Sequence, residues 1–297
     1  MTELTDPTRA QHSAAAGVAD LVRVLDLEEI DEDLFRGAPS PNERGRAFGG
    51  QVASQSLTAA IRTAGDGMTV HSMHSYFLLP GDPLHPIVYD VDRIRDGRSF
   101  QTRRVVARQH GRPIFYLTAN FQKHEDGYDH QDAMPQVPPP EQGLDMLALM
   151  ASAGVAESAA LAKEWAAVDG RIVGNSLQGL EPNPARPAQQ RVWLRIADRL
   201  PDDRDIHVAA FAWASDISLL AASLAAHTLN TGTVQMASLD HTIWFHRPFR
   251  ADEWWLYDQE SPSAQGGRGL SIGRVFAQDG RLVATVAQEG IIRPPRK

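Results

Sequence analysis

The chain contains no cysteine at any of its 297 positions. This absence excludes disulfide bonds, thiol nucleophiles and zinc or iron–sulfur centres held by cysteine. Any metal site must therefore be built from His, Asp and Glu side chains. A chain without cysteine fits a reducing compartment, and we expect a cytoplasmic protein.

Positive charge is also scarce, because 29 Lys and Arg face 37 Asp and Glu, which gives a net charge of -8. A surface of this sign repels polyanions, so we expect no nucleic-acid partner. No run of about 18 uninterrupted apolar residues occurs. Residues 1–16 carry acids and lack an apolar stretch of signal-peptide length. We therefore expect neither export nor membrane insertion.

Hydrophobic side chains make up 42% of the chain and charged ones 22%, which is an ordinary globular balance. The length allows one large domain or two modest ones, and two is the better first estimate. Between His124 and Gly143 lies a polar segment with four prolines, which exclude both helix and central strand. This segment predicts a linker between two halves.

Each half is predicted to contain a long helix followed by a run of strands. In the first half the helix spans 46–64, and alternating segments predict strands at 68–79, 87–95, 99–109 and 112–122. The second half begins with an Ala-rich helical insert at 144–168 and a loop at 170–187. A strand at 189–196 and a helix at about 206–229 follow, and then strands at 234–245, 254–262, 270–278 and 281–293.

The two runs of strands look like copies of one unit. YFLLP at 76–80 aligns with WFHRP at 244–248, and RVVA at 104–107 aligns with RVFA at 274–277. The offset stays between 168 and 170 residues, which predicts an internal duplication. A helix followed by antiparallel strands predicts an α+β fold in which a sheet wraps around a helix. Two such units are expected to pair side by side.

Common catalytic motifs are absent or lack their structural setting. GLSIG at 269–273 matches G-x-S-x-G, but we predict a strand through it, and no His follows it in the chain. No P-loop, dinucleotide-binding or H-E-x-x-H motif occurs. The pairs His71/His74 and His241/His246 offer metal ligands, but solvated or hydrogen-bonded histidines are the preferred interpretation.

Three polar residues interrupt apolar patterns in the second half. Asp216 is predicted to lie in the middle of a helix rich in Ala and Leu, Gln288 shares the apolar face of the last strand, and Ser238 begins an apolar strand. Burying an unpartnered amide costs about 1 to 3 kcal/mol. Taken singly, local roles explain each residue: an exposed position or a cap, a backbone contact, and a strand-edge hydroxyl.

Alignment of the repeats favours a shared role for these three residues. At the positions that correspond to Asp216, Ser238 and Gln288, the first repeat has Gln55, Val70 and Ala119. If these three residues had a structural role common to both copies, the two copies would not be expected to differ at these positions. One active site per chain, in the second half, would explain it.

Several longer motifs extend over most of the chain. The first half contains DLFRG at 33–37, FGGQV at 48–52, HSYFL at 74–78 and RDGRSF at 95–100; the second contains ASD at 214–216, LDH at 239–241, WFHRP at 244–248 and QEG at 288–290. In these motifs the sequence resembles the acyl-CoA thioesterase II family. The resemblance implies a double hotdog, two tandem units that each wrap an antiparallel sheet around a long central helix. We expect the units at 18–123 and 188–297, with a linker and helical insert at 124–187.

The resemblance also implies hydrolysis of fatty acyl-CoA to free fatty acid and CoA, with no metal and no bound cofactor. The family's catalytic Asp, Thr or Ser, and Gln fall on Asp216, Ser238 and Gln288. Because water attacks a thioester poorly until a base accepts its proton, Asp216 would be that base. Ser238 and Gln288 would orient the water, and the Gln288 amide could also donate to the carbonyl oxygen as it gains charge.

Some alternatives stay open. Gly49 and Gly50 open the first helix, where they either bind the thioester oxygen or only permit tight packing. The competing enzyme is a hotdog-fold enoyl-CoA hydratase or dehydratase, and the competing binding protein is a non-catalytic acyl-CoA-binding double hotdog. We expect no acyl-serine, because no His adjoins Ser238. The expected partner is acyl-CoA, and the expected assembly is a homo-oligomer, a dimer or tetramer of double hotdogs.

Overall fold

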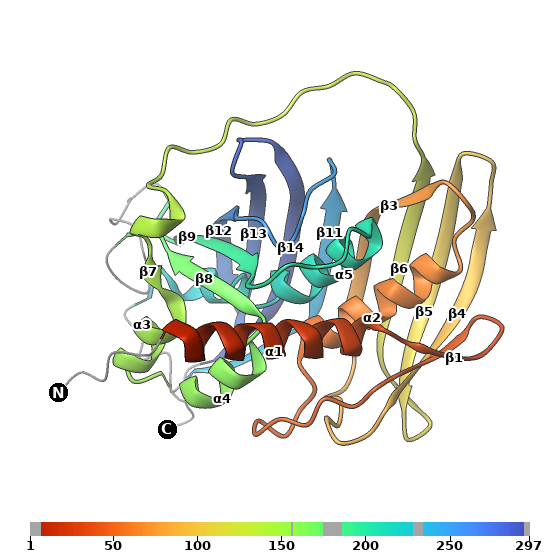
Figure 1. Cartoon of the computed structure of the whole chain (residues 1–297), viewed down its shortest axis with the longest axis horizontal. Helices are drawn as coiled ribbons and strands as arrows, with labels where there is room; N and C mark the ends of the chain where they lie inside the picture. The colour runs from red at the N-terminus through yellow and green to blue at the C-terminus, as the bar shows by residue number, and fades with distance from the viewer. Residues whose placement is uncertain (1–6, 156, 175–185, 228–233, 294–297) are drawn as a thin grey trace.

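The computed structural model describes residues 7–155, 157–174, 186–227 and 234–293 (Figure 1). Over these residues the chain forms a 14-stranded sheet in the order β1-β2-β4-β5-β6-β3-β11-β14-β13-β12-β9-β8-β7, with β10 paired to β14. Neighbouring strands run antiparallel. Two helices, α2 and α5, pack against each other within this sheet. The predicted α+β class and two-unit architecture are confirmed.

The first half follows the predicted order of one long helix and then four strands, preceded by elements that the sequence analysis did not predict. These early elements are helix α1 and the short strands β1 and β2. The bounds in this half are α1 Pro7–Leu25, β1 Glu28–Asp31, β2 Leu34–Gly37, α2 Gly49–Arg62, β3 Met68–Phe77, β4 Ile87–Asp96, β5 Phe100–Gln109 and β6 Arg112–Lys123.

The second half repeats this order after the insert. The insert contains η1 Pro140–Gln142, β7 Leu144–Asp145, α3 Met146–Ser152, α4 Ser158–Glu164 and β8 Val168–Ile172. The repeat itself contains β9 Gln189–Ile196, α5 Arg204–Ser215, η2 Leu220–Leu224, β10 Gln235–Ser238, β11 Asp240–Phe245, β12 Trp255–Gln265, β13 Arg268–Ala277 and β14 Leu282–Arg293.

The two halves join where β3 pairs with β11, and this seam is symmetric. Tyr76 pairs with Asp240, and Ser72 pairs with Trp244. The repeat offset of 168 residues relates Tyr76 to Trp244 and Ser72 to Asp240, so the two pairs are equivalent. On either side of the seam the strands follow in the same order, β6-β5-β4 on one side and β14-β13-β12 on the other. The duplication seen in the sequence is therefore a two-fold arrangement of the fold.

Helices α2 and α5 approach closely at Gly50. A Cβ atom on Gly50 would lie 2.3 Å from the backbone oxygen of Trp213, closer than any real Cβ contact. Helix α1 packs against both α2 and α5, and it crosses the front of the sheet in Figure 1. Buried side chains of both halves thus belong to one continuous hydrophobic core. The boundaries proposed from the sequence for the units stay a prediction.

The insert at 144–168 is predicted to be helical, and it does contain helix, although not as one continuous element. Two short helices, α3 and α4, lie there between strands β7 and β8. Gly154 and Glu157 adopt left-handed backbone angles, with φ of 68° and 64°, and these angles stop a continuous helix. The alanine content predicted the helical tendency of this segment but not its break.

Two other predicted elements are shorter than expected. The helix predicted at 206–229 ends at Ser215, and the 3-10 turn η2 follows it. The strand predicted at 234–245 is split between β10 and β11. At the split, Leu239 donates its N–H to Glu289 and accepts from the N–H of Phe77, so the chain crosses from one neighbouring strand to the next.

The segment Arg204–Leu224 has the length and apolarity of a membrane span, but 83% of its most apolar window is buried inside the fold. It contains helix α5, which packs against α2 in the core. Its apolar character is therefore explained by burial within the protein.

We expect Gly50→Ala to destabilise the protein by about 1 to 3 kcal/mol, because the added methyl overlaps the Trp213 carbonyl and pushes α2 from α5. The melting temperature should fall by several degrees. Gly127→Ala is the matched control, since a Cβ atom there meets nothing within 4 Å. Equal melting temperatures for the two variants would contradict this view of the helix contact.

Candidate active site

Asp216 lies where the end of α5 meets the start of α2. It is the C-cap residue of α5, with φ -82° and ψ -7°, so the predicted position in the middle of a helix is wrong. A Cβ atom on Gly49 would lie 2.7 Å from Asp216 Oδ2. The backbone N–H of Gly50 also faces the carboxylate. The Asp216 carboxylate therefore lies at the positive end of the α2 dipole.

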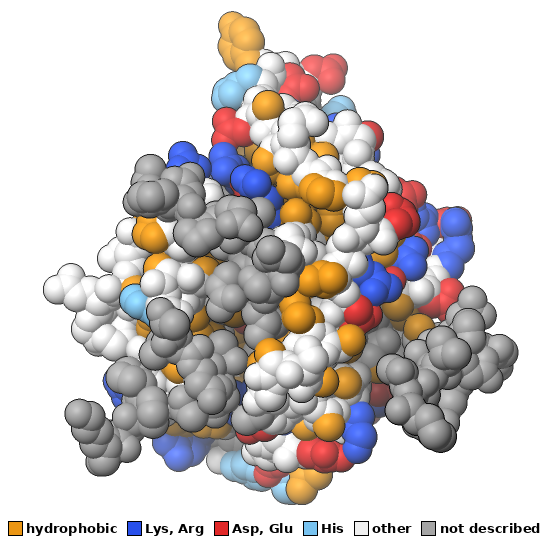
Figure 2. All heavy atoms as spheres, turned by 90° about the vertical axis from the view of Figure 1, so that its left-hand side faces the viewer, with side chains coloured by type: hydrophobic (Ala, Val, Ile, Leu, Met, Phe, Trp, Pro, Cys, Tyr) orange, Lys and Arg blue, Asp and Glu red, His pale blue; other side chains and the backbone are white. Residues whose placement is uncertain are grey.

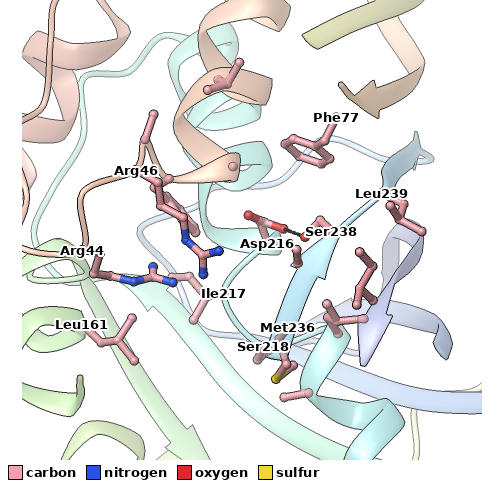
Figure 3. Close-up of a pocket in the computed structure, with 18 of the residues that line it drawn as sticks. Arg44, Arg46, Phe77, Leu161, Asp216, Ile217, Ser218, Met236, Ser238 and Leu239 are labelled. Atoms are coloured by element: carbon pink, nitrogen blue, oxygen red, sulfur yellow. Dashed lines mark hydrogen bonds between the residues drawn. The ribbon is translucent and has the colours of Figure 1, made fainter. Parts of the chain in front are cut away.

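Ser238 and Gln288 reach Asp216 from two neighbouring strands. Ser238 ends β10, and Gln288 lies on β14, where it is fully buried. Gln288 Nε2 donates to Asp216 Oδ1 at 2.6 Å and to Ser238 Oγ at 2.7 Å. Ser238 Oγ lies 3.4 Å from Asp216 Oδ1 (Figure 3). The three residues selected from the sequence are together in space.

The Gln288 amide has one favourable orientation in this arrangement. An ionised carboxylate only accepts hydrogen bonds, so the NH2 group and not the oxygen must face Asp216. With one hydrogen directed at Asp216 and the other at Ser238, no amide hydrogen is left for a substrate carbonyl. This geometry differs from the second role expected of Gln288, which was donation to the carbonyl oxygen.

Burial raises the pKa of Asp216 from 3.8 to about 6. Hydrogen bonds from Gln288, the Gly50 backbone and Ser238 lower this pKa, as does the positive charge of Arg44, but burial dominates. A carboxylate with a pKa near the working pH combines a large ionised fraction with a strong tendency to accept a proton. The surroundings of Asp216 thus suit a general base.

Asp216 and Ser238 line a cavity of about 530 Å³, whereas Gln288 lies behind them and does not line it. The cavity lies between the start of α2, the segment after β3, η2 and the insert. Its lining is mostly apolar, and the insert supplies Met146, Leu161 and Trp165. Figure 2 faces the insert side of the molecule, where hydrophobic side chains form an interrupted band between charged groups.

Two arginines stand beside the cavity (Figure 3). Arg44 forms ion pairs with Glu164 at 2.7 Å and with Glu157 at 3.1 Å. Arg46 is exposed, and its guanidinium forms no ion pair with any residue that the structure describes. An unpaired guanidinium of this kind can bind a phosphate or carboxylate through two parallel hydrogen bonds.

The aligned positions in the first half hold no comparable group. Gln55 is fully buried, where its Nε2 donates to the Val24 oxygen at 2.7 Å and its Oε1 accepts from the Tyr89 hydroxyl at 2.6 Å. Val70 and Ala119 are buried apolar residues. In the first half, therefore, the amide is part of the core, whereas the aligned position in the second half presents the Asp216 carboxylate to the cavity of about 530 Å³.

The motifs that were set aside lie outside this site. GLSIG falls within β13, so the predicted strand through it is confirmed. His241 is fully buried with its Nε2 2.8 Å from Ser215 Oγ, and His246 Nε2 lies 2.9 Å from Thr285 Oγ1. Both are hydrogen-bonded histidines, as interpreted from the sequence.

Comparison with known proteins identifies the family. A family model for "Acyl-CoA thioesterase" matches residues 162–291, and one for "Acyl-CoA thioesterase N-terminal domain" matches residues 38–122. Human acyl-coenzyme A thioesterase 8 is 41% identical over an alignment of 281 residues, which covers 91% of this chain and 88% of that protein. The chain belongs to the acyl-CoA thioesterase family. The resemblance seen in the sequence is confirmed.

Bacterial relatives of this thioesterase family agree over nearly the whole chain. Acyl-CoA thioesterase 2 of Haemophilus influenzae is 39% identical over an alignment of 282 residues, which covers 92% of this chain and 97% of that protein. The crystal structure of the acyl-CoA thioesterase II TesB2 from Mycobacterium marinum superposes with a TM-score of 0.81 at 45% identity. The superposition covers 93% of this chain and 98% of that one.

Two features of the site were not predicted from the sequence. The insert was expected to be helical but was given no role, and it supplies a wall of the cavity. Arg44 and Arg46 received no role, although both flank the FGGQV motif at 48–52. In the sequence, only their position next to this motif could have indicated a role for the two arginines. Their distance from Asp216 depends on how α2 packs against α5, which the sequence does not show.

If Asp216 is the base, kcat/KM should be proportional to the fraction of the enzyme in which the Asp216 carboxylate is ionised. The carboxylate is charged above a pH of about 6 and protonated below it. We therefore expect activity to fall about tenfold per pH unit below that value. The measurement is a pH profile of kcat/KM, with the residual activity of Asp216→Asn as control, which should lack this acid limb. An acid limb near pH 4 would contradict the raised pKa.

Gln288→Ala should move the same acid limb above pH 6, because the lost hydrogen bond favoured the ionised carboxylate. We expect kcat to fall about 10- to 100-fold, because a hydrogen bond to a charged group contributes about 1.5 to 3 kcal/mol. Gln259→Ala is the matched control, since Gln259 is equally buried but bonds to Ser218. A limb that stays at pH 6 in Gln288→Ala would show that Gln288 does not tune Asp216.

Proposed function

We propose that the chain hydrolyses fatty acyl-CoA to a free fatty acid and CoA, with Asp216 as the general base that activates water. The observation that carries this proposal is the double contact of Gln288 Nε2 with Asp216 and Ser238. This contact places a carboxylate and a hydroxyl side by side at the wall of an apolar cavity. A polar pair of this kind can hold and deprotonate one water molecule.

The cavity and its surroundings fit the two ends of acyl-CoA. Apolar side chains from the insert, α2 and η2 suit a hydrocarbon chain, which gains free energy when it leaves water. CoA carries several phosphates, and the unpaired guanidinium of Arg46 suits one of them. We therefore assign the acyl chain to the apolar cavity and a phosphate of CoA to Arg46.

Chemistry begins with a water held by Asp216 and Ser238. Asp216 accepts a proton as the water oxygen bonds to the thioester carbonyl carbon. The tetrahedral intermediate then collapses as the carbon–sulfur bond breaks. The proton on Asp216 passes to the departing thiolate, whose pKa is about 8.5 by analogy with free Cys. The products are the carboxylic acid and the CoA thiol, and Asp216 is ionised again.

The negative charge that develops on the carbonyl oxygen needs a donor other than Gln288. Gly49 lines the cavity at the N-terminus of α2, where backbone N–H groups and the helix dipole favour an anion. We assign the oxyanion to this helix end. Gly49 and Gly50 then serve both of the roles considered from the sequence, tight packing and contact with the thioester oxygen.

We also infer that Ser238 is not the nucleophile. Its hydroxyl contacts Asp216 and Gln288, and the buried His241 bonds instead to Ser215. A serine nucleophile needs an adjacent base that removes its proton, and the carboxylate 3.4 Å away is a weak contact for that purpose. We assign Ser238 to holding the water.

The expected homo-oligomer and the cytoplasmic location stay predictions. Tyr76 and Trp244 support an assembly, because these large side chains remain 50% and 37% exposed next to the β3–β11 seam. Tyr76 packs against the Tyr116 ring in a tilted arrangement, and Trp244 makes an edge-to-face contact with His74. An aromatic surface of this kind is common in protein interfaces.

Asp216→Asn tests the proposed function, because it keeps size and shape but removes the base. We expect kcat for acyl-CoA hydrolysis to fall about 10²- to 10⁴-fold. Release of free CoA thiol measures this rate, and circular dichroism and the melting temperature check the fold. Turnover at the wild-type rate in a folded variant would rule out Asp216 as the base.

Ser238→Ala should reduce kcat by the equivalent of about 1 to 4 kcal/mol, because the water loses a hydrogen bond. Ser238→Thr should stay active, since it restores the hydroxyl. Mass spectrometry of wild-type enzyme quenched during turnover should find no acyl group on the protein. An acyl adduct mapped to Ser238 would instead establish a covalent mechanism.

A further inference from the structure

A second group of reactive side chains lies in the first unit, outside the catalytic trio. Asp82 and His85 belong to the segment between β3 and β4, and His110 belongs to the turn between β5 and β6. The three side chains can direct one ligand atom each into a common space, with all three atoms within 4.8 Å of one another. Two imidazoles and a carboxylate are a donor set typical of zinc.

The distances are close to those of a metal centre. His85 Nδ1 lies 2.8 Å from Asp82 Oδ2, and His110 Nε2 lies 3.8 Å from the same oxygen. Zinc bonds of about 2.0 to 2.2 Å at tetrahedral angles place ligand atoms about 3.3 Å apart. The two observed distances bracket this value. Since all three side chains are partly exposed, small rotations bring them to it.

The backbone that carries these ligands is already fixed. The Gln109 side chain accepts from the N–H of Asp82 at 2.7 Å and donates to the backbone oxygens of Asp82 and His85, each at 2.9 Å. Gln109 directly precedes His110, so one buried amide holds both chain segments together. A binding ion then has little backbone to order, and preorganisation of this kind favours affinity.

We propose that Asp82, His85 and His110 form a zinc site that ties the segment between β3 and β4 to the β5–β6 turn. Water completes the coordination, because the protein offers three ligands. The same segment lines the catalytic cavity through Leu79, Pro80 and Gly81. Gly81 also accepts a hydrogen bond from Ala47 N at 2.8 Å, just before α2. The ion therefore stabilises one wall of the cavity and takes no part in hydrolysis.

Calorimetric titration of ZnCl2 into the full-length, untagged chain, freed of metal by chelation, tests this site. We expect a zinc-binding event that weakens about tenfold or more in Asp82→Asn and in the double variant His85→Ala/His110→Ala. Zinc should raise the melting temperature of the wild type but not of these variants, because a ligand that binds only the folded state stabilises it.

The matched control is the double variant His124→Ala/His130→Ala, which removes two exposed histidines of the linker. It should bind zinc as the wild type does. The proposal is overturned if the wild type binds no zinc. It is equally overturned if binding and the rise in melting temperature persist in both the Asp82 and the double-histidine variants, or if the linker variant loses them to the same extent.

Discussion

The close approach of helices α2 and α5 at Gly49 and Gly50 is the contact on which the site depends. Side chains at these positions would overlap Asp216 and the Trp213 backbone, so glycine alone lets the end of one helix meet the start of the other. This meeting places the Asp216 carboxylate in a partly buried position at the positive end of α2. Burial raises its pKa, while the helix end and Gln288 keep its ionised form accessible.

The duplication gives this contact a symmetric frame, but the three proposed catalytic residues all lie in the second half. The β3–β11 seam exchanges equivalent pairs, so both halves offer a helix within a curved sheet. In the first half the side-chain amide of Gln55 forms hydrogen bonds with Val24 and Tyr89 and is buried in the core. In the second half Gln288 donates its two amide hydrogens to Asp216 and Ser238. The Asp216 carboxylate and the Ser238 hydroxyl face the cavity.

Much of the fold could be predicted from the sequence, because the period-two patterns indicate the strands and the internal repeat indicates that both halves have them in the same order. Asp216, Ser238 and Gln288 could also be selected from the sequence, because the repeats differ at these positions and the family resemblance points to the same three residues. The rest depends on tertiary contacts that leave little local signal. Alanine content indicated a helical insert but not the point where Gly154 turns the chain. The pattern around Asp216 continued the helix of α5, although the chain ends that helix against Gly49.

The central claim is that Asp216 removes a proton from water and does not itself attack the thioester. Single-turnover hydrolysis in H2¹⁸O, with enzyme in excess over acyl-CoA, tests this most directly. The account predicts ¹⁸O in the carboxylic acid released in the first turnover and none in the peptide that contains Asp216. Incorporation of ¹⁸O into the Asp216 side chain, with an unlabelled acid product, would show attack by the carboxylate through an anhydride and would contradict the account.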